Sequence, residues 1–150
     1  YWLLPGLEAS ITPKFADSSI LISVNIYAGQ STTSGGYQIQ YQILKDGSEL
    51  TEANGTEEGG RQGVAGRINN YLGADPTSLQ YRMTTLGGTH LNAAVGTTNP
   101  VTFSVRMRGY SSIPAIYVNR QELFQVSTPP PGTDYDGVPQ STITLMEVSA

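Results

Sequence analysis

The chain contains no cysteine and only one histidine, His90, among its 150 residues. Without cysteine it has no disulfide to stabilise it. A zinc site needs three or four His, Cys or carboxylate ligands, which this composition does not supply convincingly. Nucleophilic catalysis needs a base beside the nucleophile, and no G-x-S-x-G motif lies near His90. We therefore expect no catalytic residues, no metal and no cofactor.

Charge is also scarce. Charged residues make up 13% of the chain, which is about half the usual share in soluble domains. Eight Lys and Arg stand against twelve Asp and Glu, giving a net charge of −4. A nucleic-acid binder needs clustered basic residues to neutralise phosphates, whereas these are scattered along the sequence. No apolar run approaches the roughly 18–20 residues of a membrane-spanning helix. We expect neither nucleic-acid binding nor membrane insertion.

The acidic residues form no convincing site. Asp134-Tyr135-Asp136-Gly137 resembles the beginning of a calcium-binding loop, but the third acidic ligand and the distal Glu are absent. Glu57 and Glu58 are adjacent in a glycine-rich segment, which is typical of a solvated loop tip rather than of a glycosidase pair. Asn54-Gly55-Thr56 matches a glycosylation sequon, although the Asn-Gly pair more strongly favours a turn.

Alternation of apolar and polar residues with period two is the dominant pattern that is present. It predicts three clear strands, over residues 20–27, 37–43 and 101–108. In the second of these, Gln40 and the neighbouring glutamines are expected to face solvent. An Asp46-Gly47 turn then predicts a short partner strand near Glu49.

Weaker patterns predict further strands over residues 79–86, 91–95, 115–119 and 141–148. Residues 54–66 and 121–140 are expected to be irregular, since Pro129-Pro130-Pro131 cannot join a sheet ladder. Helical spacing is absent. About eight short strands separated by turn signals predict a single all-β domain, a sandwich or a barrel.

The last predicted strand is apolar on both faces. Ile143 and Leu145 share one face, and Met146 and Val148 share the other. Such a strand is expected to be buried on both sides. In a two-layer domain, the face that points away from the core is often covered by another subunit. The alternative is that a loop of the same chain covers it.

The irregular segment 121–140 carries the candidate binding residues, Phe124, Asp134, Tyr135 and Asp136. Aromatic rings in loops pack against a partner while nearby polar groups form hydrogen bonds. The alternative for Phe124 is that it closes the end of the domain.

Several segments resemble one known family. Ile116-Tyr117-Val118-Asn119-Arg120, a polar loop with Asp134 and Tyr135, and the ending Ser141-Thr142-Ile143-Thr144-Leu145-Met146-Glu147-Val148 resemble the C-terminal part of many tail-fibre and related virion proteins. These proteins belong especially to phages of marine and freshwater bacteria, cyanobacteria included. The segment 7–13, followed by Ser18-Ser19-Ile20-Leu21-Ile22, resembles the opening of the same family, except that a Lys usual before the Ile is missing. The similarity spans residues 7–148 and is weakest over 51–66.

The resemblance implies a trimeric jelly-roll sandwich of the tumour-necrosis-factor-like type, with the C-terminal strand near the threefold axis. Ile143, Leu145, Met146 and Val148 are then the candidate trimer-interface residues, and no catalytic residues carry over. The implied location is the virion, an extracellular particle. The implied partners are the chain itself, other virion proteins and a host cell-surface glycan.

The leading hypothesis is a fibre or spike domain that presents loops for host attachment. The alternatives are a capsid decoration or cement subunit and a lectin-like carbohydrate-binding module. Because the sequence starts at Tyr1 rather than Met, we expect the single domain of residues 1–150 to be a C-terminal or processed part of a longer chain.

Overall fold

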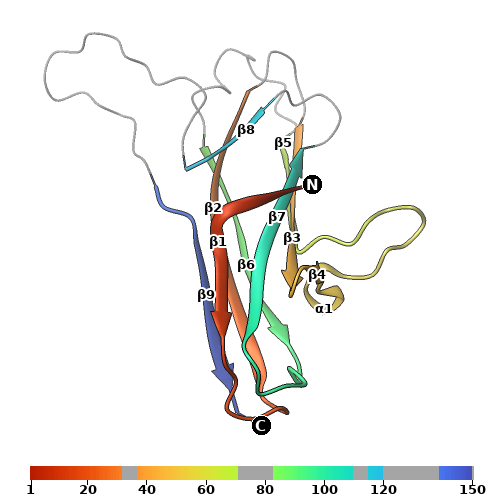
Figure 1. The fold of residues 1–150 in the computed structure, drawn as a ribbon. Helices are drawn as coiled ribbons and strands as arrows, with labels where there is room; N and C mark the ends of the chain where they lie inside the picture. Colours follow the sequence, from red (N-terminus) through yellow and green to blue (C-terminus); the bar gives the residue numbers. More distant parts are fainter. Residues whose placement is uncertain (32–36, 71–82, 110–114, 120–138, 150) are drawn as a thin grey trace, which may run out of the picture.

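A computed structural model describes residues 1–31, 37–70, 83–109, 115–119 and 139–149. Within these ranges the chain forms two antiparallel sheets that face each other as a β-sandwich (Figure 1). The expected all-β fold is therefore confirmed at the level of a sandwich.

The first sheet has the order β1-β7-β3, and two short strands, β4 and β5, share the remaining edge of β3. β4 pairs with Leu44 and Lys45, whereas β5 pairs with the stretch from Tyr37 to Tyr41. The strand bounds in this sheet are β1 (Trp2–Ile11), β3 (Tyr37–Lys45), β4 (Ser48–Glu49), β5 (Gly66–Asn70) and β7 (Val101–Gly109).

The second sheet repeats this arrangement around β2. β6 lies along one edge of β2, and β9 and β8 share the other edge, with β9 opposite Ser19–Asn25 and β8 opposite Ala28–Ser31. The bounds in this sheet are β2 (Ser19–Ser31), β6 (Met83–Asn92), β8 (Ala115–Val118) and β9 (Thr142–Val148).

The three clear strands of the sequence analysis are confirmed as β2, β3 and β7. The predicted hairpin between β3 and β4 is also present. Asp46 and Gly47 have φ values of 47° and 80°, and positive φ at both central residues is what a type I′ turn requires. The turn sets the register in which Lys45 pairs with Ser48.

The core lies between the two sheets, on the faces that the alternation predicted. Ile20, Ile22 and Ile26 of β2 are fully buried, and so are Ile39 and Ile43 of β3. Phe103 of β7 is also fully buried and is among the largest side chains of the core. These residues belong to one continuous cluster, which is the main hydrophobic contribution to stability.

Two predicted strands, over 79–86 and 91–95, are corrected to the single strand β6. β6 pairs with β2 without interruption from Met83 to Asn92; residues 79–82 lie outside the described part. One strand was predicted as two because Gly87 and Gly88 interrupt the alternation of side chains, and glycine is unfavourable in the interior of a strand. A Cβ on Gly87 would lie 2.3 Å from the Val24 carbonyl oxygen, so the close approach of β6 to β2 requires glycine there.

The expectation of no helix is also corrected, whereas residues 55–65 lie between α1 (Thr51–Asn54) and β5, outside any helix or named strand, as expected of an irregular segment. α1 forms one turn, and Asn54 at its end is 2% exposed. The Asn54 side chain lies against the part of the β3 edge left between β4 and β5. Ile43 N donates to Asn54 Oδ1, and Asn54 Nδ2 donates to Ile43 O, both at 2.8 Å. A side chain held in this way is not placed to accept a glycan.

Gln40 and Gln42 were expected to face solvent, and this is wrong. They do lie opposite the core, but they are only 8% and 1% exposed. The chain after α1 returns over this outer face, and Gln42 Nε2 donates to the Gly63 carbonyl at 2.6 Å. On the other side of β3, the Nε atoms of Arg106 and Arg108 donate to the side-chain oxygens of Gln42 and Gln40, at 2.8 and 2.9 Å. The alternation correctly predicted which face of β3 the two glutamines occupy, but it did not predict that other parts of the chain cover this face.

The gap between β9 and β8 on the edge of β2 is closed in a similar way to that on β3. Tyr27 lies in this gap, where its N–H donates to Ser141 Oγ at 3.0 Å and its carbonyl accepts from Asn119 N at 2.8 Å. Ser141 N in turn donates to Asn119 Oδ1 at 2.8 Å. Asn119 and Ser141 are thus held together on β2, although they are far apart in the sequence.

Truncation of the central aromatic residue should strongly destabilise the sandwich. We expect Phe103→Ala to lower the free energy of unfolding by about 3–5 kcal/mol, because it removes a buried ring and leaves a cavity. Glu8→Ala, at an exposed position of β1, should change it by less than about 0.5 kcal/mol. Urea denaturation of the two variants would measure the difference, and similar costs would contradict the core assignment.

Asn54 should matter through its hydrogen bonds rather than its volume. Asn54→Leu keeps a side chain of similar size but leaves the buried Ile43 N–H without its partner, which costs about 1–3 kcal/mol. We expect Asn54→Asp to cost as much, since its carboxylate oxygen would face the Ile43 carbonyl. Denaturation midpoints for both variants test this, and wild-type stability of Asn54→Leu would show that the side-chain bridge is dispensable.

Candidate functional site

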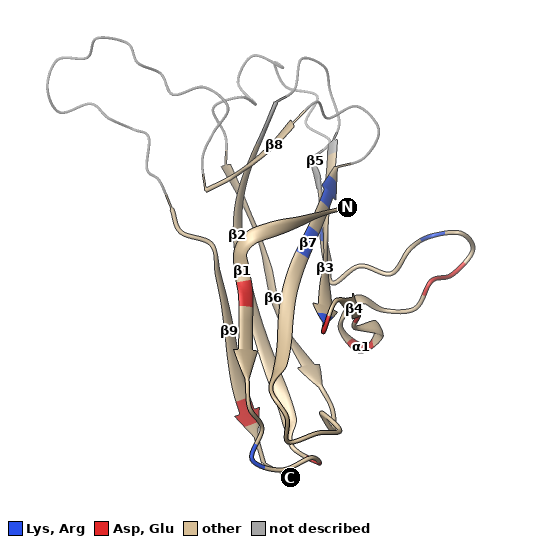
Figure 2. Cartoon of the chain, viewed as in Figure 1, with Lys and Arg blue, Asp and Glu red and all other residues tan. Residues whose placement is uncertain are grey.

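The outer face of the second sheet carries no charged side chain among its described residues. We call this surface the neutral face. β2 and β6 contain no Lys, Arg, Asp or Glu and are entirely tan in Figure 2. Glu147 is the only charged residue of β9, and it points to the opposite side of the strand from the exposed residues. The neutral face comprises Ser19, Leu21, Ser23, Asn25, Tyr27, Thr85, Gly87, Thr89, Leu91, Thr142, Thr144, Met146 and Val148.

An apolar row crosses the neutral face. Leu21 of β2 pairs with Leu91 of β6 on one side and with Met146 of β9 on the other. Leu91 is 47% exposed and Met146 is 58% exposed. Side chains directly opposite one another lie within contact distance, so the three strands present one apolar strip to solvent. Val148, which is also exposed, extends it along β9.

Small polar side chains continue the surface beyond this row. Ser23 pairs with Thr89 and with Thr144, and the Ser23 and Thr89 hydroxyls lie 3.3 Å apart. Asn25 pairs with Gly87 and Thr142 in the row after that. Charged residues are depleted at the centres of protein interfaces, and exposed apolar patches mark interaction sites. The neutral face therefore suits contact with another protein surface better than it suits catalysis.

The predicted interface residues divide between the two faces of β9. Ile143 and Leu145 face inward and pack against the core, whereas Met146 and Val148 face outward and are exposed. No loop in the described part of the chain covers Met146 and Val148. The sequence analysis did not identify Leu21 and Leu91 as neighbours of Met146 in the sheet, although the sequence contains one indication of such a row. Leu21 is the apolar exception on the otherwise polar side of β2.

The candidate binding residues Phe124, Asp134, Tyr135 and Asp136 lie outside the described residues. The residues that flank this segment are described. Asn119 and Ser141 are joined by hydrogen bonds on the edge of β2. The two described residues that flank the candidates are therefore held together on the edge of β2.

His90 points between the sheets and takes part in a structural hydrogen bond. Its Nε2 lies 3.1 Å from the hydroxyl of Tyr41, and the two rings meet edge to face. Gly88 leaves room for this pair, since a Cβ there would lie 3.1 Å from His90 Nε2. Burial raises the pKa of Tyr41 to about 12 and lowers the pKa of His90. Both groups are therefore neutral at pH 7, as expected of a polar contact within a core.

No group of three His, Cys, Asp or Glu side chains able to hold a metal occurs in the described ranges. Likewise, no helix there is long and apolar enough to cross a membrane.

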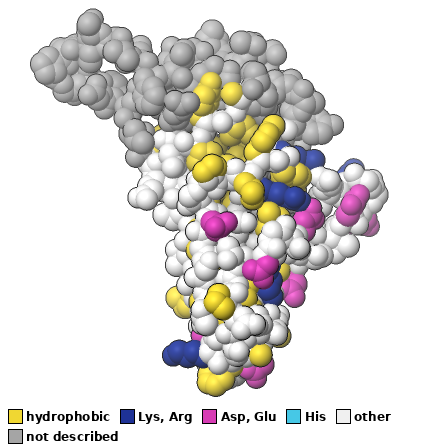
Figure 3. Space-filling model, viewed as in Figure 1, with side chains coloured by type: hydrophobic (Ala, Val, Ile, Leu, Met, Phe, Trp, Pro, Cys, Tyr) yellow, Lys and Arg dark blue, Asp and Glu magenta, His cyan; other side chains and the backbone are white. Residues whose placement is uncertain are grey.

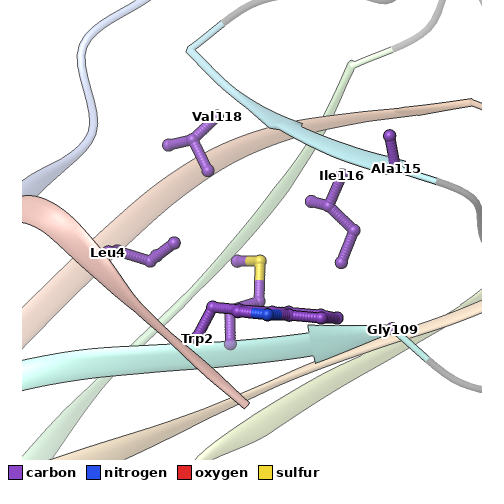
Figure 4. Close-up of a pocket in the computed structure, with 7 residues that line it drawn as sticks. Trp2, Leu4, Gly109, Ala115, Ile116 and Val118 are labelled. Atoms are coloured by element: carbon purple, nitrogen blue, oxygen red, sulfur yellow. The ribbon is translucent and has the colours of Figure 1, made fainter.

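An apolar hollow of about 280 Å³ lies at one end of the sandwich, between the two sheets. Ile116 and Val118 of β8 and Leu4 of β1 point toward the space beside the indole of Trp2 (Figure 4). Trp2 is 69% exposed, so its ring forms part of the rim. Apart from the indole N–H, the lining side chains offer no polar group to orient a ligand. The hollow extends the core rather than forming a catalytic pocket.

Comparison with models of known protein families gives no match, and no curated protein matches the chain.

The Tyr41–His90 pair should make stability depend on pH at both extremes. Unfolding restores the Tyr41 pKa from about 12 to its ordinary value of 10.0. The unfolded chain therefore ionises first, and stability falls as the pH rises from 10 toward 12. On the acid side, the lowered pKa of His90 means that the unfolded chain takes up a proton first below about pH 6.5, and stability falls there too.

Tyr41→Phe isolates the alkaline effect. We expect this variant to lose about 1 kcal/mol at pH 7 because its hydrogen bond to His90 is gone. Between pH 10 and 12 it should lose less stability than the wild type, as measured by urea midpoints. An identical alkaline loss in both proteins would show that Tyr41 does not contribute.

Proposed function

We propose that this chain is a trimeric jelly-roll domain of a bacteriophage virion, part of a fibre or spike that presents loops for attachment to the host surface. The observation that carries the proposal is the uncharged, partly apolar neutral face, which leaves the outer side of β9 open to a second subunit. The similarity of residues 7–148 to virion proteins supplies the biological setting.

The strand order supports the jelly-roll assignment. A jelly roll folds two Greek keys over one another, so that sequence-distant strands become neighbours. Here β7 lies between β1 and β3, and β2 lies between β6 and β9. Consecutive strands also alternate between the sheets from β1 to β3 and again from β5 to β8. This is the connectivity expected when a long hairpin-like ribbon wraps around a sandwich.

The neutral face supports the trimer. An exposed apolar row at the middle of an uncharged surface resembles the centre of an interface. Closed cyclic symmetry would bury it on every subunit, with no open edge left to recruit further copies. Met146 and Val148 are the predicted interface residues that face outward, and Leu21 and Leu91 would join them.

The attachment role follows from the position of the segment between Asn119 and Ser141. Both of its flanking residues are anchored to β2, and a rigid scaffold that holds variable loops is the usual arrangement for recognition. In the proposed role, Phe124 and Tyr135 contact the partner, with Asp134 and Asp136 beside them.

Analytical ultracentrifugation tests the assembly directly. We expect a single species near three times the chain mass of 16.0 kDa. The double change Leu91→Lys and Met146→Lys should convert it to a folded monomer, because six like charges would meet at the closed interface.

Phe15→Lys is the matched control, since Phe15 is exposed to the same extent as Met146, 58%, but lies outside the neutral face. This control should remain trimeric. A wild-type monomer at micromolar concentration would refute the assembly, and a trimer that survives the double change would place its interface elsewhere.

A further inference from the structure

A second surface, on the outer side of the first sheet, gathers arginine side chains around a glutamine. Gln40 of β3 pairs with Arg67 of β5 on one side and with Arg108 of β7 on the other. Directly opposite side chains in an antiparallel sheet share one face, so the two guanidinium groups flank one amide. Figure 3 shows a dark blue patch over β7, beside the loop that follows α1.

The chain between α1 and β5 completes the site. Glu58 and Arg61 exchange backbone hydrogen bonds of 3.1 and 3.0 Å around Gly59-Gly60. Both glycines have positive φ, and Arg61 closes this tight turn. The result is a hollow of about 640 Å³, which we call the arginine hollow. Its lining residues are Gln38, Gln40, Glu57, Gly60, Arg61, Gln62, Val64, Arg67 and Arg108.

The two ends of this loop, at Gly55 and Gly63, lie close together. A Cβ on Gly63 would lie 2.1 Å from the Gly55 carbonyl oxygen, so only glycine allows the two ends of the loop to meet there. The Gly63 carbonyl also accepts the hydrogen bond from Gln42. The Asn54 bridge to Ile43 fixes the start of the same loop. The wall of the hollow is therefore held to β3 at both ends.

The positive charges in the hollow are not neutralised by the protein. Within the described ranges, Arg61, Arg67 and Arg108 have no carboxylate within 4 Å, and Arg106 outside the hollow pairs with Glu49. Three of the eight basic residues of an acidic chain thus converge on one hollow. Arg67 and Arg108 lie on either side of Gln40, so an anionic ligand in the hollow would be attracted by both guanidinium groups.

Arg108 is positioned for binding. Its Nε donates to Gln40 Oε1 at 2.9 Å, and its guanidinium carbon lies 4.7 Å from the centre of the Tyr1 ring. These two contacts hold the planar group, and its terminal nitrogens have no hydrogen-bond partner among the described residues. A planar guanidinium matches a carboxylate with two parallel hydrogen bonds.

We propose that the arginine hollow binds a carboxylated saccharide. The guanidinium groups would take the carboxylate, and the amides of Gln38, Gln40 and Gln62, which both donate and accept, would take the hydroxyls. Glu57 can accept from a hydroxyl, and its charge disfavours a densely anionic ligand. An acidic peptide fits less well, since Val64 is the only apolar side chain in the lining. The site is independent of the trimer, but its use in host attachment rests on the proposed function.

Calorimetric titration with trigalacturonic acid tests the proposal, and its methyl ester is the uncharged control of nearly the same shape. We expect the acid to bind, its affinity to fall with added salt, and the ester not to bind. Arg67→Gln should weaken binding by about tenfold, the loss of one charge-assisted contact. Arg67 is exposed, so the variant should fold normally. Lys14→Gln removes the same charge outside the hollow and should bind as the wild type does.

Several outcomes would overturn this proposal. They are absence of binding at millimolar acid, equal binding of the ester, or equal affinities of Arg67→Gln and Lys14→Gln. Displacement of the acid by inorganic phosphate at equal concentration would identify a general anion site instead. Sedimentation of the same samples separates the two proposals. A monomer that binds the acid refutes only the trimeric role, and a trimer that does not bind it refutes only the saccharide site.

Discussion

The fold depends on how two long strands satisfy their backbone groups where their partners change. Each of β2 and β3 is paired along one edge by two shorter strands in line, and the gap between these shorter strands interrupts the ladder of backbone hydrogen bonds. Buried backbone groups without partners are costly. Asn54 fills the gap at Ile43, and Asn119 with Ser141 fills the gap at Tyr27. At Ile43 the side-chain amide of Asn54 supplies both a donor and an acceptor. At Tyr27 the acceptor is Ser141 Oγ and the donor is the backbone N–H of Asn119.

These two bridges also position the functional surfaces. The Asn54 bridge fixes the start of the loop that forms one wall of the arginine hollow, and Gly63 closes that loop over Gln42. The bridge between Asn119 and Ser141 gathers the two ends of the segment that carries Phe124 and Tyr135. In both places described residues that flank a longer connection are tied to the centre of a sheet.

The two outer faces of the sandwich have opposite character. One is neutral, with an apolar row through Leu21, and the other carries Arg67, Arg106 and Arg108. A neutral face favours permanent contact with a like surface, because burying it desolvates no charge. Arg67 and Arg108 have no carboxylate partner among the described residues, whereas Arg106 pairs with Glu49, so this face favours an anionic ligand that arrives from solvent. The two outer faces would therefore suit partners of different chemistry.

The sequence by itself determined the strands with strict alternation, their inward faces and the Asp46-Gly47 turn, because these features depend on residues close together in the chain. It also indicated that Met146 and Val148 face away from Ile143 and Leu145. Only the tertiary structure decided which strands are neighbours. The burial of Gln40 and Gln42, the continuity of β6 through Gly87, the bridge made by Asn54, and the meeting of Arg67 with Arg108 all follow from that choice. Period two fixes the side of a strand on which a residue lies, but it carries no information about what the rest of the chain places there.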